Sequence, residues 1–371
     1  MPPPLKIQQG CSMLTNAEAA VSEAAAQLGA EAPALTLAFF SSEYNLPALG
    51  QSLQQAVKGP VVGCTTAGQL AAQGFQKGGL CLTAIAGPDL IAVPYLIHPL
   101  ASLEEQVERL GEDVQRRLSD TGMKAFGFLL VDGLSEKEEP LIASLYRVLG
   151  DVPIVGGSAG DMLQFKRTAV YHEGQLLTDA AVFTLCLTSR PFRVFKHQHF
   201  LPTGQRLVIT EAEPAKRMVR EINGEPAVKA YARLIGKEPG QLDASDFSKH
   251  PLMLRIRDDY YVRSISGVEA DGSLKFYCAI DTGLVLTIGE GHMAAEAFEQ
   301  TLQDISEEIG DISVILGCDC VLRRLEMEQH GVAGRFSQLI VQHNVVGFST
   351  YGEQFNSVHL NQTFTGVAIG G

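Results

Sequence analysis

The sequence predicts a mixed α/β protein whose sheets are built from a repeated unit of strand, helix, strand, turn and strand. One glycine-rich pattern occurs three times, as VVGCTTAGQ at 61–69, IVGGSAGDM at 154–162 and VVGFSTYGE at 345–353. An apolar run typical of a buried strand precedes each copy, and a stretch with helical character lies between the run and the copy. A further apolar run follows each copy. Strand, helix and strand in this order predict a right-handed crossover within a mixed sheet.

Local patterns define the elements around the first copy. Thr15 and Glu18 have the spacing of a capping box at the start of an alanine-rich helix, and Gly29 ends that helix. ALTLAFF is a compact apolar run that predicts a buried strand. The predicted elements are helices at 15–28 and 45–57 and strands at 34–40 and 78–87.

The clearest amphipathic helix precedes the second copy. Apolar residues recur every three or four positions along 101–118, and Ser102 and Glu105 supply a capping box. A second capping box is predicted at Ser135 and Glu138. The strands of this region are predicted at 125–131 and 180–188.

Two alternating runs near the third copy predict a β-hairpin. Asp271-Gly272 lies between the runs 260–268 and 274–280, and Asp-Gly at such a place is a strong hairpin signal. A helix at 292–308 and strands at 311–318 and 359–369 complete the chain. We expect a larger domain at 1–224 and a second domain at 225–371, with the last strand completing the sheet of either one.

Composition limits the partners of the protein. The formal net charge is −13, which argues against nucleic acid and against an anionic membrane surface, because both attract clustered Lys and Arg. No apolar run reaches the roughly 18 residues that a membrane-spanning helix needs. The N-terminal residues lack the apolar stretch of a signal peptide. We therefore expect a cytoplasmic protein with no nucleic-acid or membrane partner.

The seven cysteines do not suggest a disulfide framework, because their number is odd and their spacing irregular. Cys318 and Cys320 are the only close pair, and no second pair with the spacing of a zinc site accompanies them. Buried free thiols are the expected state.

The three glycine-rich turns are candidates for a ligand site. Small hydroxyl side chains and amides at strand ends line pockets in open α/β sheets. Tight turns required only for packing are the alternative, and both interpretations stay open. The candidate residues are Gly63, Thr65, Thr66, Gly156, Gly157, Ser158, Asp161, Ser349, Thr350 and Glu353.

Residues 156–160 spell G-x-S-x-G, the pattern of a hydrolase nucleophile elbow at Ser158. A nucleophile elbow leads directly into a long helix, whereas the residues after Asp161 are short of helical pattern and become β-like. We therefore expect no hydrolase and, more broadly, no enzyme.

Three histidines and three arginines have suggestive settings. His199 shares a strand face with His197 in FKHQHF, His250 precedes an apolar strand, and His359 follows the third turn. Arg255, Arg257 and Arg263 lie on nearby strand-like sequence, where cations pair with the carboxylates of a ligand.

Several longer motifs resemble those of FIST proteins, which contain a FIST N domain followed by a smaller FIST C domain. The motifs are GCTTAG, VGGSAGD, INGEPAVKAYARLIG, YYVRSISGV, DGSLKF, GFSTYGEQ and HLNQTFTGVAIG, in this order from about residue 30 to the end. The resemblance implies an intracellular sensory module that binds small ligands such as amino acids. KHQHFLPTG, FYCAID, CDCVLRRLE and TYGEQ are similar to the subset of haem proteins that sense nitric oxide.

That subset regulates a histidine kinase or cyclic-di-GMP enzymes, so the resemblance implies such a partner. The chain shows no kinase, cyclase or receiver domain of its own. We expect haem b, with His199 as the first choice of iron ligand, His250 and His359 behind it, and the three arginines near the propionates. A metabolite sensor that uses the glycine-rich turns is the alternative. Whether the protein forms a homodimer is left open.

Overall fold

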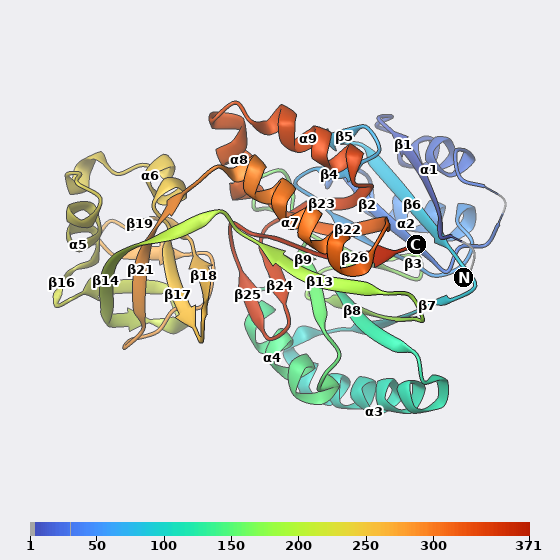
Figure 1. Cartoon of the computed structure of the whole chain (residues 1–371), viewed down its shortest axis with the longest axis horizontal. Coiled ribbons are helices and arrows are strands. Elements are labelled where there is room, and N and C mark those ends of the chain that lie inside the picture. Colours follow the sequence, from blue (N-terminus) through green and yellow to red (C-terminus); the bar gives the residue numbers. More distant parts are fainter. Residues whose placement is uncertain (1–3, 30) are drawn as a thin grey trace.

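The computed structural model describes residues 4–29 and 31–371, which form a mixed α/β fold with four sheets (Figure 1). Three sheets have six strands each and mix parallel with antiparallel pairs. The fourth sheet has eight strands and forms a separate lobe, on the left in Figure 1. The predicted fold class is confirmed.

Each six-stranded sheet has the same central unit, so the predicted repeat is confirmed. Two parallel strands are connected through one or two helices. A glycine-rich turn and a short hairpin follow, and the next strand pairs antiparallel with the first of the two parallel strands. The first unit consists of β2 (Leu35–Phe40), α2 (Leu46–Ala56), β3 (Val61–Thr65) and β6 (Leu80–Ala86). The second consists of β8 (Lys124–Val131), α4 (Glu138–Leu149), β9 (Ile154–Ser158) and β12 (Ala181–Thr188). The third consists of β22 (Ile312–Cys320), α8 (Val321–Gln329), α9 (Ala333–Gln342), β23 (Val345–Thr350) and β26 (Phe364–Gly370).

The hairpin after each glycine-rich turn crosses to the sheet of another unit. The hairpin β4 (Gln69–Ala71) to β5 (Gly74–Gln76) leaves the first unit and pairs with β23 of the third. The hairpin β10 (Val170–His172) to β11 (Gln175–Leu177) leaves the second unit and pairs with β3 of the first. The hairpin β24 (Glu353–Phe355) to β25 (Val358–Leu360) leaves the third unit and pairs with β9 of the second. The exchange is cyclic, so the three units close on one another.

The outer edges of the three sheets also correspond. One strand pairs antiparallel with the last strand of each unit: β1 (Lys6–Ser12) with β6, β7 (Leu90–Ile97) with β12, and β13 (Phe192–His197) with β26. The common core lies where the sheets face one another, and Phe39 of the first unit stacks on Phe348 of the third with ring centroids 4.6 Å apart.

A glycine recurs at one position in all three copies for a steric reason. Gly63, Gly156 and Gly347 each lie directly opposite a residue of the neighbouring parallel strand. A Cβ at these positions would come within 2.0, 2.1 and 1.8 Å of the opposing carbonyl oxygen, respectively. No side chain fits at such distances, so only glycine permits this close strand contact.

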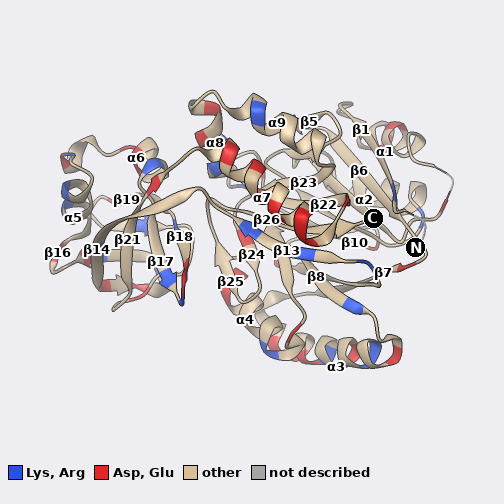
Figure 2. Cartoon of the chain, in the orientation of Figure 1, with Lys and Arg blue, Asp and Glu red and all other residues tan. Residues whose placement is uncertain are grey.

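None of the three predicted capping boxes forms as predicted: the cap of the first helix is shifted by one residue, and Ser102 and Ser135 make no capping hydrogen bond. Asn16, not Thr15, caps α1 (Ala17–Ala26) by accepting a hydrogen bond from the Ala19 N–H at 2.9 Å. Ser102 precedes α3 (Leu103–Thr121) without a capping bond, because its hydroxyl donates to the Pro99 carbonyl, and Ser135 likewise donates to the Asp132 carbonyl. The predicted amphipathicity of α3 is confirmed, since its outer face carries charges of both signs (Figure 2).

The fourth sheet runs in the order β18-β17-β21-β14-β15-β20-β19, with β16 paired to β15. Its strands are β14 (Phe200–Glu213), β15 (Met218–Ile222), β16 (Glu225–Pro226), β17 (Leu252–Ile256), β18 (Asp259–Arg263), β19 (Ile265–Val268), β20 (Leu274–Phe276) and β21 (Val285–Gly291). The predicted Asp271-Gly272 hairpin is confirmed between β19 and β20, although the run 260–268 divides at Ser264 into two strands. The predicted domain boundary, between residues 224 and 225, falls at the start of β16.

The remaining helices cover the edges of the two lobes. α5 (Ala227–Leu234) and α6 (Ala244–Lys249) pack on the fourth sheet, whereas α7 (Ala294–Ile309) packs on β13 and β26. Short 3-10 turns lie at Leu100–Ser102, Pro214–Lys216 and Pro239–Gln241. Within the described part of the chain, no helix is long and apolar enough to cross a membrane.

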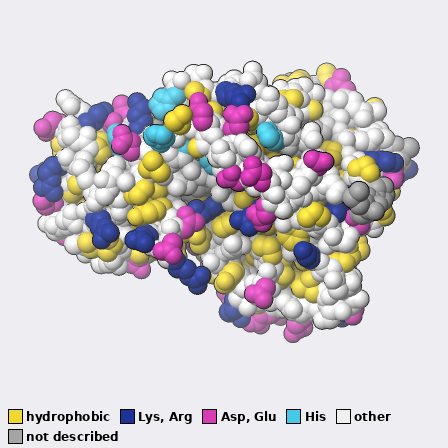
Figure 3. Space-filling model, viewed as in Figure 1, with side chains coloured by type: hydrophobic (Ala, Val, Ile, Leu, Met, Phe, Trp, Pro, Cys, Tyr) yellow, Lys and Arg dark blue, Asp and Glu magenta, His cyan; other side chains and the backbone are white. Residues whose placement is uncertain are grey.

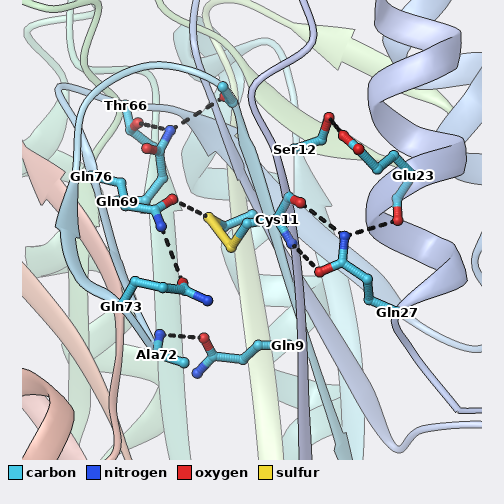
Figure 4. The surroundings of a disulfide bond; sticks show 12 residues. Gln9, Cys11, Ser12, Glu23, Gln27, Thr66, Gln69, Ala72, Gln73 and Gln76 are labelled. Carbon is cyan, nitrogen blue, oxygen red and sulfur yellow. Dashed lines mark hydrogen bonds between the residues drawn. A yellow bond between two sulfur atoms is a disulfide. The ribbon is translucent and has the colours of Figure 1, made fainter.

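Five cysteines are free and buried, as the sequence predicts, including Cys318 and Cys320. Cys11 and Cys81 depart from the prediction, because they form a disulfide between β1 and β6 (Figure 4). The two residues lie directly opposite each other in the antiparallel ladder with Cα atoms 4.2 Å apart. Spacing alone does not reveal this pair, since 70 positions separate the two cysteines in the sequence.

Candidate functional site

A cavity of about 370 Å³ lies between the repeated units and the fourth sheet. Residues that follow β8, β9, β22 and β23 form one wall, and Arg217, just before β15, forms the other with residues of β19 and β20. The lining residues are Gly133, Leu134, Glu136, Glu138, Leu163, Phe165, Arg217, Ser266, Lys275, Phe276, Tyr277, Val321, Leu322 and Tyr351. This position, at the carboxyl ends of strands, is where ligands bind in open α/β sheets. We call it the interlobe cavity.

Arg217 connects the two walls of the interlobe cavity. Its Nη2 lies 3.1 Å from Glu138 Oε2 and 2.8 Å from Glu139 Oε2, and its Nη1 donates to the Tyr277 carbonyl at 2.6 Å. Burial raises the pKa of the Glu138 carboxyl to about 7, although Arg217 opposes the rise. Burial also works to raise the pKa of Glu139, but His359, Arg217 and a backbone N–H outweigh it, so that pKa is lowered. Glu139 is therefore the charged partner of Arg217, and Glu138 is the carboxyl that changes protonation near neutral pH.

The carboxylate of Asp161 folds the loop that forms another part of this wall. Its two oxygens accept hydrogen bonds from the backbone N–H groups of residues 165, 166 and 167 at 2.7–2.9 Å. The Tyr351 hydroxyl donates to the same carboxylate and accepts from the Leu163 N–H at 2.7 Å. Burial and the bond to Asp161 raise the pKa of Tyr351. Phe165 stacks on the Tyr351 ring with centroids 4.8 Å apart, so the loop presents an aromatic surface to the cavity.

Of the two cations that line the cavity, Arg217 and Lys275, only Lys275 is available to pair with a ligand. Its side chain extends from β20 and is exposed. Among residues 4–29 and 31–371 it has no ion-pair partner, whereas Arg217 is already held by two carboxylates. An unpaired ammonium beside apolar walls favours an anionic group of a small ligand.

The glycine-rich turns themselves meet in the interior. Gly160 N donates to the Thr65 carbonyl at 3.0 Å, Ala67 N donates to the Ser349 carbonyl at 3.0 Å, and Ser158 N donates to the Gly352 carbonyl at 2.8 Å. Every pair of turns is thus joined by backbone hydrogen bonds. The hydroxyl-bearing candidates are all buried, namely Thr65, Thr66, Ser158, Ser349 and Thr350. The turns act as the junction of the three units, and Tyr351 is their member that lines the interlobe cavity.

Gly157 and Glu353 belong to the same buried junction. A Cβ on Gly157 would come within 2.5 Å of the Thr350 methyl carbon, so the second and third units pack closely there. Glu353 Oε2 accepts hydrogen bonds from Thr363 N and Oγ1, at 3.2 and 2.8 Å, and Oε1 contacts the Thr350 hydroxyl. Burial raises the pKa of Glu353 to about 8.

Ser158 is not placed as a nucleophile. Its hydroxyl is fully buried and accepts a hydrogen bond from Gln354 Nε2 at 3.0 Å. The residues after it form turns and then β10, so the helix of a nucleophile elbow is missing, as predicted. His359 lies behind Gln354, with Nδ1 3.2 Å from Gln354 Nε2, and burial lowers the pKa of His359 to about 4.

A second cavity, of about 250 Å³, brings two of the predicted histidines together. His199 and His250 line it with His292 and His330, which sequence reasoning missed. Histidine side chains are visible at the surface between α6 and α8 (Figure 3). His199 Nε2 lies 2.9 Å from Glu326 Oε1, with both side chains buried. His359 and the three arginines line other surroundings: Arg263 donates to the His359 carbonyl at 2.8 Å, while Arg255 and Arg257 are exposed in the β17–β18 hairpin.

This histidine-lined cavity does not fit haem. A haem pocket needs apolar walls around an oriented imidazole. Here the walls are mostly imidazoles, carboxylates and Lys249, with Met293 and Ala294 as apolar members, and Glu326 already engages His199. No three of the His, Cys, Asp and Glu side chains in the described part of the chain are placed to hold a metal ion together.

The principal residues of the interlobe cavity were missed by sequence reasoning. Arg217 and Lys275 come from the fourth sheet, and no motif connects them to the turns they face. Tyr351 lies inside the third glycine-rich copy, so its position next to the turn was a usable signal. Asp161 was predicted as a ligand-binding residue; its carboxylate accepts from the backbone of the loop beside the cavity, and its contact with a ligand stays a prediction.

Comparison with known proteins finds two family models that match the chain. The FIST N domain matches residues 34–225, and the FIST C domain matches residues 227–356. An uncharacterized protein of Methanocaldococcus jannaschii is 22% identical over 352 residues, which cover 83% of this chain and 67% of that protein.

Proposed function

This chain belongs to the FIST family, and we propose that it is a sensory module that binds a small amino-acid-like metabolite in the interlobe cavity. The family points to a sensory role. The observation that carries the proposal is the 370 Å³ cavity at the carboxyl ends of the repeated strands, with Lys275 on one wall and Glu138 on the other. Its volume is within the range of small-molecule sites, about 300–1,000 Å³.

The chemistry of the walls favours a zwitterion with a short apolar side chain. Lys275 supplies an unpaired positive charge for a carboxylate. Glu136 and Glu138 supply carboxyl oxygens for an ammonium group, and Glu138 is charged above its pKa of about 7. Leu134, Phe165 and Phe276 give the apolar contact that small-molecule sites use for affinity.

The position of the cavity suggests how binding is converted into a signal. Its two walls belong to different lobes, so a ligand that contacts both favours one relative arrangement of the lobes. A change in that arrangement alters the surface offered to a partner protein. A histidine kinase or a cyclic-di-GMP enzyme as that partner stays a prediction from the resemblance, as does the cytoplasmic location.

A thermal-shift screen with the standard L-amino acids, followed by calorimetry on those that stabilise the protein, tests this proposal. We expect at least one amino acid to raise the melting temperature, because a ligand that binds only the folded state stabilises it. Lys275→Met should weaken its binding roughly 10- to 100-fold, since a charge-assisted hydrogen bond contributes about 1.5–3 kcal/mol. Lys229→Met, on α5 outside the cavity, is the matched control.

Two results would overturn the proposal. One is a screen in which no amino acid changes the melting temperature. The other is an equal loss of affinity in Lys275→Met and Lys229→Met, which would place the ligand elsewhere. The amine formed by removing the carboxylate from the best ligand should bind Lys275→Met and the parent equally.

A further inference from the structure

The Cys11–Cys81 disulfide lies at an edge of the first sheet. It joins β1, the outermost strand of that sheet, to β6, and β1 has no other strand partner in the described part of the chain. Figure 4 shows the disulfide surrounded by glutamines from β1, from the hairpin β4–β5 and from the position that follows α1. The site is remote from the interlobe cavity and does not depend on its proposed function.

The two sulfur atoms differ in accessibility. Cys11 is partly exposed, whereas only 4% of Cys81 is exposed. A thiol reagent from solvent therefore reaches Cys11 Sγ first, and Cys81 Sγ is the leaving group. Access of this kind distinguishes exchangeable disulfides from buried structural ones.

A hydrogen-bond acceptor for the reduced Cys81 thiol is already in place beside the disulfide. Cys81 Sγ lies 3.2 Å from Gln76 Oε1 on β5, and the Gln76 amide is held by its donation to Gln73 Oε1 at 3.1 Å (Figure 4). A carbonyl oxygen accepts from a thiol, but a disulfide sulfur has no hydrogen to donate. The Gln76 oxygen therefore gains its hydrogen bond only when Cys81 is a thiol.

Other contacts keep Cys11 in place when the disulfide is open. Gln27, which follows α1, accepts from the Cys11 N–H at 3.3 Å and donates to the Cys11 carbonyl at 2.9 Å. Gln9, on the same strand, accepts from the Ala72 N–H at 2.6 Å. These bonds fix the backbone opposite Cys81, so the two thiols stay in position to form the disulfide again.

We propose that Cys11 and Cys81 form a reversible thiol–disulfide exchange site that controls how tightly β1 is held. A thiolate of a dithiol reductant attacks Cys11 Sγ, which forms a mixed disulfide and releases Cys81 as a thiolate that takes up a proton. The second thiol of the reductant then displaces Cys11, so the reductant becomes a disulfide and both cysteines become thiols. Two electrons and two protons pass to the protein.

Opening the disulfide should loosen β1 and the hairpin that it contacts. Reduction removes the disulfide cross-link between β1 and β6 and leaves their ladder hydrogen bonds. The hairpin β4–β5 donates the Ala72 N–H to Gln9 of β1, places the acceptor Gln76 Oε1 beside Cys81 Sγ, and pairs with β23 of the third unit. Reduction at the edge of the first sheet should therefore also loosen the pairing of this hairpin with the third unit.

Alkylation of the full chain with mass spectrometry tests the proposal. Protein equilibrated with oxidised glutathione, then denatured in the presence of iodoacetamide, should show five alkylated cysteines, because the described structure contains five free thiols. Folded protein treated with dithiothreitol should show all seven, and renewed oxidation should restore five. Hydrogen exchange of residues 6–12 and 69–76 should be faster in the reduced protein, with little change in α4.

Variants keep the test decisive. Cys11→Ser leaves six cysteines, and all six should be alkylated under both conditions, whereas Cys186→Ser should keep the redox response. Seven alkylated cysteines after oxidation would show that no disulfide forms and would overturn the proposal. Five alkylated cysteines after dithiothreitol on the folded protein would also overturn it, because the disulfide would then be an inaccessible structural bond.

Discussion

Glu138 and Arg217 meet at 3.1 Å across the boundary between the second unit and the fourth sheet. Glu138 begins α4, whereas Arg217 precedes β15, so this contact joins the two lobes at the interlobe cavity. The pKa values of both partners are raised, which a single ion pair does not explain. Glu139, at 2.8 Å from the same guanidinium, resolves this, since it carries the charge while burial favours a proton on Glu138.

The buried Glu138 makes stability depend on pH. Burial raises its pKa in the folded protein to about 7, above the ordinary value of 4.5, so the folded state binds the proton more tightly than the unfolded state. The associated stability is fully present below pH 4.5 and is lost as the pH rises through 7. Glu138→Gln should remove this dependence and at pH 8 should exceed the parent by on the order of 2–3 kcal/mol.

Urea denaturation of parent and variant at several pH values between 5 and 8 measures the effect. Glu136→Gln is the control, because Glu136 is exposed and makes no ion pair in the described structure. Parallel pH profiles for Glu138→Gln and the parent would show that Glu138 does not hold the proton.

The repeated glycine predicts a severe effect of one methyl group. In Gly156→Ala the new Cβ would lie 2.1 Å from the Leu129 carbonyl oxygen, and the two strands must move apart. We expect a loss of at least about 3 kcal/mol or failure to fold, since overpacking in a core costs 1–3 kcal/mol even where it is tolerated. Gly334→Ala in α9 is the matched control, because no atom lies within 4 Å of its added Cβ.

Denaturation with urea compares the two alanine variants. Gly334→Ala should change the free energy of unfolding by less than about 1 kcal/mol. A similarly small change in Gly156→Ala would contradict the steric reason for the repeated glycine.

The repeated unit could be predicted because its signals are local. β-branched residues followed by Gly156 and its counterparts lie within the second strand of each parallel pair, and the apolar runs before them are the neighbouring strands. The cyclic exchange of hairpins could not be predicted, because Gln69 and Leu70 pair with residues nearly 280 positions away for reasons of packing. The same holds for the interlobe cavity, where Lys275 faces turns of distant sequence.

Local signals also failed at the level of single residues. Thr15 and Asn16 are both good capping residues, and their neighbours in sequence do not decide between them. The glycine-rich turns carry hydroxyl side chains typical of a binding site, and their role as ligand contacts stays a prediction. In the structure Thr65 Oγ1 accepts from the buried Ala169 N–H, and Ser158 Oγ accepts from Gln354 Nε2.

Absorption spectroscopy checks the haem prediction. The walls around His199 are polar and its Nε2 contacts Glu326, so we expect protein incubated with haem to show no Soret band that depends on His199. The alanine variants at His199, His250 and His359 should have the spectrum of the parent. A stoichiometric band that disappears in His199→Ala or His250→Ala, but remains in His98→Ala, would contradict this and establish a histidine-bound haem.

Glu353 should tolerate glutamine but not alanine. Burial raises its pKa to about 8, so at pH 6 the carboxyl is protonated; Oε2 accepts from Thr363, and the Thr350 hydroxyl that contacts Oε1 can act as donor or acceptor. A glutamine amide reproduces both bonds, so Glu353→Gln should change stability by less than about 1 kcal/mol at pH 6. Glu353→Ala leaves the Thr363 donors without a partner and opens a cavity, which should cost about 2–5 kcal/mol.

Raising the pH separates the parent from Glu353→Gln. Because the folded-state pKa lies above the ordinary 4.5, the parent loses stability as the pH rises from 4.5 through 8, and the glutamine variant does not. The free energies of unfolding of the two proteins should therefore diverge between pH 6 and pH 9, with the variant the more stable at pH 9. Glu112→Gln, at an exposed position of α3 with no ion pair in the described part of the chain, controls for the general effect of removing one charge. If the difference in free energy of unfolding between the parent and Glu353→Gln is the same at pH 6 and at pH 9, the prediction is wrong. Glu353 would then be ionised in the core, and its threonine partners, rather than a proton, would compensate for its burial.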